Sequence, residues 1–312
     1  MRIYEYNSAD SAALTGGRVI ALGFFDGVHA GHRSLLKAAK ERSERDNVPF
    51  AVFTFRSEAA DMKAGTRLYS TSQKLSLIED CGADEVVLAD FESMRGLTAE
   101  EFVRDFLIAE CGCTVAVTGR DFRFGSGAAG STEMLTRIMR ETGRDVIIVD
   151  DVTRLGKKVS TTAIKALLTD GDAESAALML SLPYFIEAIV EHGRGVGRTL
   201  GFPTLNCNMA ENVGILRHGV YLSTAEIGGV RYPALTNVGV CPTFEERTEH
   251  AETYLLDFDG ELYGEHVKIY LLKFMREERR FSSASELTEQ ISSDIERAKK
   301  EFCDKWQEIG LR

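Results

Sequence analysis

Short apolar runs rich in β-branched residues alternate with helical patterns over the first half of the chain, and this alternation restricts the possible folds more than any other feature. Between the runs, segments such as HRSLLKAAKERSERD and AEEFVRDFLIAEC carry apolar residues three and four positions apart, as an amphipathic helix requires. Strands that alternate with such helices predict βαβ units and a parallel sheet covered on both faces. The predicted strands are residues 18–24, 50–55, 84–91, 114–119 and 144–150.

The second half of the chain has a different character. Four of the five prolines lie from Pro183 onward, where strand-like segments are joined by glycine-rich turns. The pair Gly228-Gly229 predicts a tight hairpin turn, and the segment after Phe281 has the Ser start and the spacing of one closing helix. The predicted antiparallel strands are residues 184–191, 219–227, 230–238, 252–258 and 265–274.

The chain has 312 residues, enough for two domains of about 150 residues, each with its own core. We predict an α/β domain over residues 1–182. A small antiparallel β-barrel with a C-terminal helix is predicted over residues 183–312.

The balance of 37 Lys and Arg against 48 Asp and Glu gives a formal net charge of −11, which argues against a protein that binds nucleic acid by broad phosphate neutralisation. The six cysteines form no zinc-binding pattern and predict reduced thiols. No signal peptide and no membrane-spanning run is apparent. We therefore predict a cytoplasmic protein without a membrane partner, and the sequence does not determine its oligomeric state.

The most informative short stretch is GFFDGVHAGH at residues 23–32, directly after the first predicted strand and at the start of a helix. Its glycines allow the backbone to turn tightly and approach a ligand. A helix N-terminus offers unpaired N–H groups and a positive dipole end, which suit phosphates. His29 and His32, three residues apart, are placed to hydrogen-bond and neutralise a triphosphate as charge builds toward the leaving pyrophosphate. Surface histidines on an ordinary helix are the alternative.

A second candidate phosphate site lies at residues 158–165, where Ser160, Thr161 and Thr162 supply hydroxyls and a helix start, and Lys165 adds a cation one turn later. Taken alone, this stretch favours an ordinary Ser/Thr helix cap.

These stretches carry a resemblance. GFFDGVHAGH is similar to the G-x-F-D-G-x-H-x-G-H signature of the HxGH nucleotidyltransferases, TGRDFRFG at 118–125 is similar to the DFRFG segment of bacterial FAD synthetases, and KVSTTAIK at 158–165 occupies the place of their ISSTxIR motif. The resemblance implies a Rossmann-like nucleotidyltransferase domain in which His29, His32 and Lys165 are catalytic. The implied nucleotide contacts are Gly23, Phe25, Asp26, Gly27, His29, His32, Ser160 and Thr161, and the implied flavin contacts are Asp121, Phe122, Arg123 and Phe124.

A glycine-rich stretch at residues 191–206 is the second dense group of candidate residues. Backbone N–H groups of its loop can surround phosphate oxygens, with Gly193, Gly195, Gly197 and Arg198 as the nucleotide contacts. Thr204 and Asn206 lie two apart, hence on one side of an extended segment, and each offers a neutral oxygen ligand for Mg²⁺. A glycine-rich barrel turn without a ligand is the alternative.

GRGVGRTLGFPTLN at residues 193–206 resembles the GRxLGFPTxN signature of riboflavin kinases, and shorter matches follow in order to Phe281. With the N-terminal motifs, the resemblance spans residues 17 to 305 and is to the bifunctional bacterial riboflavin kinase/FAD synthetase family. It implies that Glu252 is the general base of a kinase and that Arg276 contacts flavin. It also implies riboflavin, FMN and ATP as substrates and co-substrate, with Mg²⁺ or alternatively Mn²⁺.

Two other functions stay open at this point. In the first, the chain is a riboflavin kinase whose N-terminal domain is degenerate. This is motivated by Phe24 in place of the usual Asn, by Lys165 in place of Arg, and by Arg56-Ser57-Glu58 where a Pro-His-Pro stretch is typical. In the second, the chain is a flavin-binding regulatory protein, although such a protein could dispense with Glu252, Thr204 and Asn206.

Overall fold

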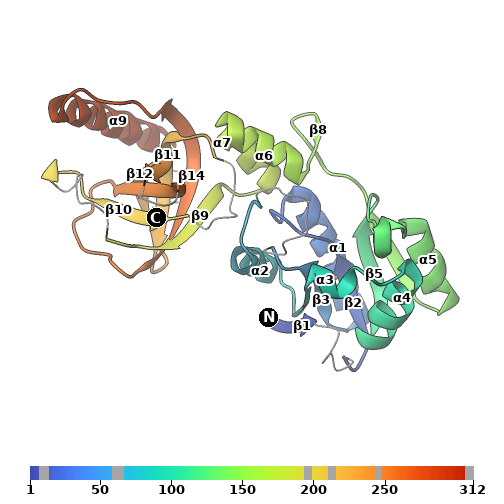
Figure 1. Cartoon of the computed structure of the whole chain (residues 1–312). Helices are drawn as coiled ribbons and strands as arrows, with labels where there is room; N and C mark the ends of the chain where they lie inside the picture. Colours follow the sequence, from blue (N-terminus) through green and yellow to red (C-terminus); the bar gives the residue numbers. More distant parts are fainter. Residues whose placement is uncertain (7–13, 58–66, 193–198, 210–215, 243–246, 306–312) are drawn as a thin grey trace. The chain divides into compact units, whose positions relative to one another are not determined.

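The computed structural model divides into two compact units, Met1–Thr161 and Thr162–Arg312 (Figure 1). It describes residues 1–6, 14–57, 67–192, 199–209, 216–242 and 247–305.

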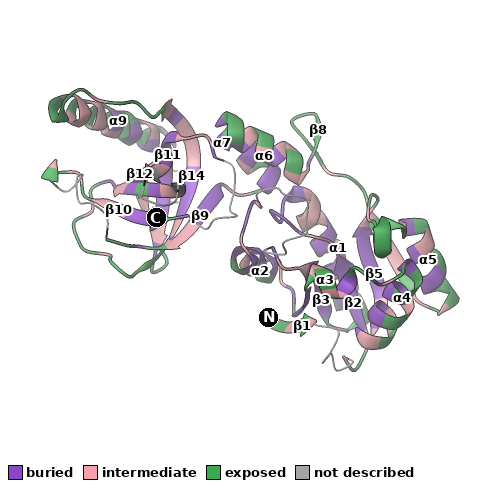
Figure 2. Cartoon of the chain, viewed as in Figure 1, coloured by how far each residue is buried: buried purple, intermediate pink, exposed green. Residues whose placement is uncertain are grey.

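The first unit is built on a six-stranded sheet in which every pairing is parallel, with the strand order β1-β4-β3-β2-β5-β6. The five predicted strands are confirmed, and the additional strand β1 joins one edge of the sheet. The residues of β2 and β4 are all buried (Figure 2), as expected for a sheet covered on both faces. The strands are β1 (Arg2–Tyr6), β2 (Arg18–Leu22), β3 (Phe50–Phe55), β4 (Glu85–Ala89), β5 (Cys113–Gly119) and β6 (Asp145–Val149).

Helices connect these strands. The segment AEEFVRDFLIAEC forms the short helix α4, capped by Thr98, and then continues as π-helical turns in η1. Phe102 and Phe106 of η1 pack into the sheet's core. The connections are α1 (Ala30–Asp46), α2 (Thr71–Asp80), α3 (Phe91–Met94), α4 (Ala99–Glu101), η1 (Phe102–Glu110), η2 (Ser126–Ala128), α5 (Thr132–Glu141), and the small strands β7 (Thr153–Arg154) and β8 (Lys157–Lys158).

The second unit is a curled antiparallel sheet with the strand order β10-β13-β12-β11-β14-β9. Beyond the end of β9, the Glu191 N–H donates to the Asn206 carbonyl of β10 at 2.8 Å, so the two edges of the sheet meet and the predicted barrel is confirmed. The hairpin turn at Gly228 and Gly229 is also confirmed, with φ of 57° and 81°. The strands are β9 (Tyr184–Ile189), β10 (Thr204–Asn208), β11 (Gly219–Ile227), β12 (Val230–Pro242), β13 (Arg247–Leu255) and β14 (His266–Glu277).

Helices α6 (Thr161–Asp170), α7 (Ala173–Leu180) and α9 (Ala284–Lys305) complete the second unit, and α9 is the predicted closing helix. Ala298 and Phe302 of α9 pack against buried side chains of the barrel strands, including Val220 and Leu235. Because α6 and α7 group with the barrel, the compact units divide earlier in the chain than the change of sequence character at residue 183.

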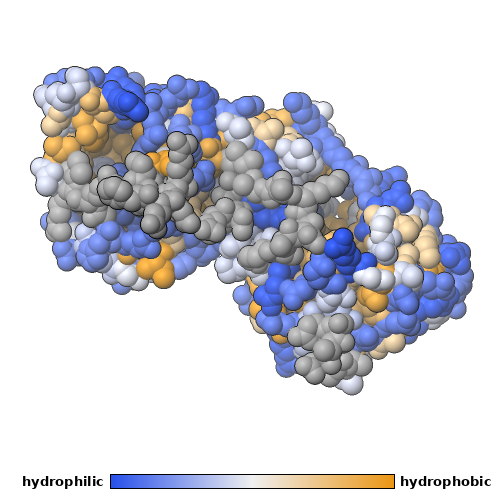
Figure 3. Space-filling view, viewed as in Figure 1, coloured by the Kyte–Doolittle hydropathy of each residue, from blue (hydrophilic) through white to orange (hydrophobic). Residues whose placement is uncertain are grey.

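Among the helices in the described part of the chain, none is both long and apolar enough to cross a bilayer. On the face shown in Figure 3, hydrophilic residues cover most of the visible surface, and apolar residues occur in small groups.

Candidate active sites

The loop between β2 and α1 holds the first motif in a strained conformation. Phe25 and Val28 have positive φ values of 53° and 39°, and Gly27 lies between them with φ of 87°. Positive φ in residues other than glycine costs about 1–3 kcal/mol each and persists only where the surroundings enforce it. Here the side chains of Phe25 and Val28 are fully buried. The core therefore holds this turn in the shape that the first candidate site needs.

His29 and His32 lie together where the loop enters α1. His29 is the N-cap, and its Nδ1 accepts a hydrogen bond from the His32 backbone N–H at 3.2 Å. The two rings stack with centroids 3.6 Å apart. Burial lowers the pKa of His29 to about 4, and burial followed by the charges of His29 and Lys74 holds the pKa of His32 well below its usual value. Both rings are thus neutral near pH 7 and would contact a phosphate as hydrogen-bond donors. The sequence suggested that these histidines also neutralise phosphate charge, and this would require them to take up protons when the phosphate binds.

Asp26 links the first motif to the start of α6. Its Oδ1 accepts from the Leu68 N–H at 3.0 Å, and its backbone carbonyl accepts from the Thr161 hydroxyl at 3.0 Å. Two motifs 135 residues apart in the sequence therefore meet at Asp26. Lys165 lies four residues further along α6, in the second compact unit.

A group of cations surrounds Phe24, a position that sequence reasoning noted only as a departure. The Lys74 Nζ and the Arg67 guanidinium lie 5.0 and 4.9 Å from the centre of its ring, and the ring of Phe55 stacks at 6.1 Å. Lys74 is fully buried and donates to the Phe55 carbonyl, at the carboxyl end of β3. No sequence motif identified Lys74, because its contacts with Phe24 and Phe55 join segments that are distant in the sequence.

The segment Asp121–Phe124 follows the carboxyl end of β5. Phe122 and Phe124 stack with centroids 5.6 Å apart, and Phe124 is buried against Phe102 of the core. Asp121 is exposed and pairs with Lys158, two residues before Ser160. Arg123 is exposed. Asp121 thus brings this segment next to the candidate phosphate site at residues 158–165, while Phe124 packs in the hydrophobic core.

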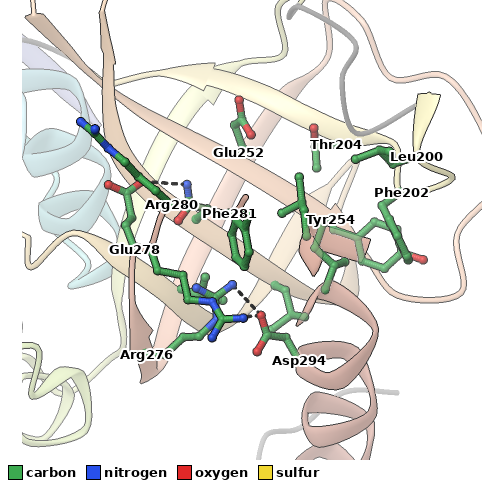
Figure 4. Close-up of a pocket in the computed structure, with 16 residues that line it drawn as sticks. Leu200, Phe202, Thr204, Glu252, Tyr254, Arg276, Glu278, Arg280, Phe281 and Asp294 are labelled. Carbon is green, nitrogen blue, oxygen red and sulfur yellow. Dashed lines mark hydrogen bonds and ion pairs between the residues drawn. The ribbon is translucent and has the colours of Figure 1, made fainter. Parts of the chain in front are cut away.

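The second unit contains a cavity of about 540 Å³ on one face of the barrel (Figure 4). Thr204, Glu252 and Arg276 all line it, which brings together three residues singled out in the sequence. The cavity also contains residues that sequence reasoning did not assign to the site, namely Leu200, Phe202, Val220, Leu235, Asn237, Tyr254, Glu278, Arg279, Arg280, Phe281, Leu287, Ile291 and Asp294. The apolar spacing of α9 indicated a buried face, and only the fold shows that part of this face lines a cavity.

Glu252 is positioned by strand register. It pairs with Asn206 of β10 on one side and with Asn237 of β12 on the other. Its neighbour Thr253 points to the opposite face, where its hydroxyl lies 2.9 Å from that of Thr236, fully buried. Glu252 itself is exposed and lies in the cavity (Figure 4).

Thr204 belongs to two hollows. Besides the large cavity, it lines a smaller pocket of about 170 Å³ that also includes Asn206 and Tyr263. The ring of Tyr263 stacks on His192 with centroids 3.8 Å apart. Thr204 therefore lines both the larger, mainly apolar cavity and the smaller pocket. The predicted phosphate contacts Gly193, Gly195, Gly197 and Arg198 lie outside the described residues.

Arg276 is held by an ion pair. Its guanidinium contacts the Asp294 carboxylate of α9 at 2.7 and 2.9 Å (Figure 4). Its Nε and Nη2 both donate to one carboxylate oxygen, Oδ2, and these two contacts fix the orientation of the guanidinium. It also ties α9 to β14 at the edge of the cavity.

Thr204 and Asn206 form a donor set that fits Mg²⁺, because Mg²⁺ prefers oxygen ligands and takes only one or two from protein when phosphates and water supply the others. Within the described residues, no group of three or more His, Cys, Asp and Glu could hold a metal ion.

Comparison with known proteins assigns each half of the chain to a family. The model of the riboflavin kinase family matches residues 180–302, and that of the FAD synthetase family matches residues 11–163. The bifunctional riboflavin kinase/FMN adenylyltransferase of Escherichia coli K12 is 35% identical, covering 91% of this chain and 92% of its own length. The protein of the same name from Bacillus subtilis 168 is also 35% identical, with 92% and 93% covered.

A crystal structure from Streptococcus pneumoniae, described as a macrolide-efflux protein, aligns with a TM-score of 0.86 and 28% identity, over 96% of this chain and 99% of the other. Two domain matches in the same chain and relatives similar over nine-tenths of their length define a two-domain transferase. The chain belongs to the family of bifunctional riboflavin kinase/FMN adenylyltransferases.

Proposed function

We propose that this chain phosphorylates riboflavin to FMN in its second unit and joins FMN to AMP in its first, which forms FAD and releases pyrophosphate. The observation that carries the proposal is the cavity in which Glu252, Thr204 and Arg276 meet, within the span that matches the riboflavin kinase family. The paired His29 and His32, within the span that matches FAD synthetase, support the second activity.

In the kinase reaction, the 5′-hydroxyl of riboflavin lies beside Glu252, whose carboxylate accepts its proton as the oxygen attacks the γ-phosphorus of ATP. The bond to the β-phosphate oxygen breaks, and ADP leaves. A base placed at the nucleophile contributes about 10²–10⁴-fold. The apolar part of the cavity, including Val220, Leu235 and Phe281, would hold the flavin ring.

Thr204 and Asn206 would hold Mg²⁺, with Mn²⁺ as an alternative, next to the nucleotide phosphates. When bound, the cation neutralises charge on the transferred phosphoryl group. The position of Thr204 between the two hollows supports this assignment, because the transferred group has to pass from nucleotide to flavin at their boundary. Gly193, Gly195, Gly197 and Arg198 would contact the phosphates.

In the adenylyl transfer, an oxygen of the FMN phosphate attacks the α-phosphorus of ATP, and the bond to the departing pyrophosphate breaks. The nucleophile is already anionic, so no protein base is needed. His29 and His32 would donate hydrogen bonds to the phosphates, together with Ser160, Thr161 and Lys165. Asp121, Phe122, Arg123 and Phe124 would border the flavin, and the turn from Gly23 to Gly27 would approach the nucleotide.

A cytoplasmic location and the absence of a nucleic-acid partner complete the proposal. The five cysteines that the structure describes are free thiols, which supports a reducing compartment. The net charge of −11 supports small-molecule substrates over nucleic acid.

Chromatography of flavins over time tests the proposal. Purified protein is mixed with riboflavin, excess ATP and Mg²⁺, and we expect FMN to appear first and then to give way to FAD. Accumulation of FMN without FAD would show a kinase alone. No change in riboflavin would contradict the kinase activity, and FMN supplied in place of riboflavin would then test adenylyl transfer. No product from either flavin would leave a flavin-binding protein.

A further inference from the structure

A chain of polar side chains leads to Asn206, and its other members take no part in the chemistry proposed above. These are Glu191, just beyond the end of β9, Asn208 of β10 and His250 of β13. In the pairing of β10 with β13, Asn208 lies opposite His250, and Asn206 lies opposite Glu252, two residues further along each strand. His250 therefore lies on the same face of β13 as Glu252.

The contacts determine how both amides are turned. The Asn208 Nδ2 donates to the Glu191 carboxylate, so its Oδ1 faces His250 Nδ1 at 3.0 Å. The Asn206 Nδ2 donates to the Thr204 carbonyl at 3.2 Å, so its Oδ1 faces His250 Nε2, also at 3.2 Å. The two ring nitrogens of His250 thus face two amide oxygens, and because a neutral ring has one N–H, it donates to only one of them; in the tautomer protonated at Nε2, it donates to Asn206. Each amide is held at its nitrogen as well.

The orientation of Asn206 matters because only one end of an amide can ligate a cation. An amide that turns over presents NH₂, which has no lone pair for a metal. The amide oxygen has two lone pairs, so contact with His250 leaves one of them available. Asn206 is 8% exposed, and so little water competes for its oxygen.

We propose that His250 is a positioning residue for phosphoryl transfer, which holds the Asn206 amide with its oxygen presented to the divalent cation of the metal–nucleotide complex. The inference rests on the proposed function, in which Asn206 is a ligand of that cation. Asn208, held by Glu191, lies beside the other nitrogen of the His250 ring.

Binding of Mn²⁺ in the presence of ADP, followed by the electron paramagnetic resonance signal of free Mn²⁺, tests this independently of turnover. We expect His250→Ala in the full-length chain to weaken Mn²⁺ binding about tenfold, as loss of a residue that orients a metal ligand typically does. In FMN formation, the Mg²⁺ concentration for half-maximal rate rises by a similar factor, while the rate at saturating Mg²⁺ changes little. His250→Gln, which retains a donor that can reach Asn206, restores most of the binding.

His266→Gln is the matched control, since His266 is a surface histidine of the same barrel that faces Glu187 at 3.4 Å. It should bind Mn²⁺ like the unaltered protein. Quenching of riboflavin fluorescence shows that the cavity of each variant is intact. If His250→Ala impairs this quenching, His250→Gln becomes the variant that tests the inference. Normal quenching by His250→Gln, together with Mn²⁺ binding about tenfold weaker than that of the unaltered protein, would overturn the inference. Failure of His250→Gln to restore either property would also overturn it.

Asn206→Ala separates the two proposals. If Asn206→Ala loses Mn²⁺ binding and His250→Ala with normal quenching does not, the inference is wrong and the metal assignment stands. If Asn206→Ala binds Mn²⁺ normally, the metal assignment fails and the positioning role of His250 fails with it.

Discussion

At the scale of single residues, the two sites use opposite environments. Glu252 is exposed in its cavity. His29 is buried and His32 is half-buried, and loss of contact with water lowers the pKa of both rings. The proposed base and the proposed phosphate donors therefore lie in different surroundings.

Replacement of Glu252 by Gln keeps the size of the side chain and removes its capacity to accept a proton. We expect FMN formation to slow at least about tenfold, while the affinity for ATP stays nearly unchanged. Steady-state kinetics with varied ATP measure both quantities. A turnover equal to that of the unaltered protein would remove Glu252 from the role of base.

Replacement of His32 by Ala should abolish formation of FAD from added FMN, because it removes a half-buried hydrogen-bond donor at the start of α1. Formation of FMN from riboflavin should stay unchanged, since that reaction uses the other unit. Chromatography with each flavin as the starting substrate measures the two rates. Loss of both activities in folded protein would contradict the separation of the sites.

The lowered pKa of His29 makes the stability of the first unit depend on pH. The pKa is about 4 in the folded chain, against the ordinary value of 6.5 for a histidine in water, so the unfolded chain binds the proton more readily. The contribution of neutral His29 to the free energy of unfolding is therefore fully present above pH 6.5 and is lost as the pH falls toward 4. The loss is about 2 kcal/mol between pH 7.5 and pH 5.

Hydrogen exchange of α1 amides, corrected for the intrinsic rate at each pH, measures this loss. His29→Asn keeps a side chain able to cap α1 and cannot titrate in this range. Its loss of protection between the two pH values should be smaller than that of the unaltered protein. Equal losses would show that His29 is not the group responsible.

At the scale of elements, strand ends and strand register place the functional residues. The first motif follows β2 and the Asp121–Phe124 segment follows β5, which is a direct neighbour of β2, so both lie at the carboxyl edge of one parallel sheet. In the barrel, Glu252 and Asn206 come together because β13 and β10 pair in one register. A slip of one residue would turn Glu252 to the opposite face.

Gly219 at the start of β11 tests this dependence on close strand packing. Its φ is +149°, and a Cβ there would overlap the carbonyl oxygen of Arg276. We expect Gly219→Ala to destabilise the barrel by about 2–3 kcal/mol and to impair FMN formation, because β14 and Arg276 must shift. Formation of FAD from FMN should persist.

Gly228→Asn is the matched control for Gly219→Ala. Gly228 also has a positive φ, +57°, but a Cβ there meets nothing within 4 Å, and Asn tolerates this conformation. Urea unfolding of both variants and assay of both reactions give the comparison. Equal stability of the two variants would refute the packing argument at Gly219.

At the scale of the whole molecule, the chain joins two sites whose reactions follow each other. FMN is the product of one site and the substrate of the other, and each site is built from residues of distinct sequence spans. Both reactions consume ATP, yet the two phosphate-binding arrangements share no motif. The two catalytic functions should therefore be separable by mutation.

A mixture of the Glu252→Gln and His32→Ala variants should convert riboflavin to FAD, because FMN made by the second variant can diffuse to the first. A double variant should not do so at a comparable rate. Chromatography of flavins from the mixture, from each variant alone and from the double variant measures this. Failure of the mixture would show that FMN does not pass between molecules.

Local patterns predicted the alternation of strands and helices in the first unit, the antiparallel strands of the second and the glycine-rich candidate sites, whereas the roles of Glu252 and Arg276 came from the family resemblance. The alternation of residue types predicts the sheet, and the glycine–histidine and glycine–proline motifs predict turns near phosphates. Both kinds of pattern can be read from the sequence because they depend on neighbours in the chain. The sequence also predicted the closing helix and the hairpin turn at Gly228-Gly229. It did not predict β1, whose assignment depends on pairing with β4 some 80 residues later.

Tertiary structure alone decided which candidate residues meet. Contact of Thr161 with Asp26, the ion pair of Arg276 with Asp294, and the position of His250 against Asn206 all join residues from separate elements. The same holds for the neutrality of His29, since burial depends on what packs around a side chain. Residue type and local spacing determine what a group can do, whereas long-range packing determines its neighbours, its contact with water and therefore its chemistry.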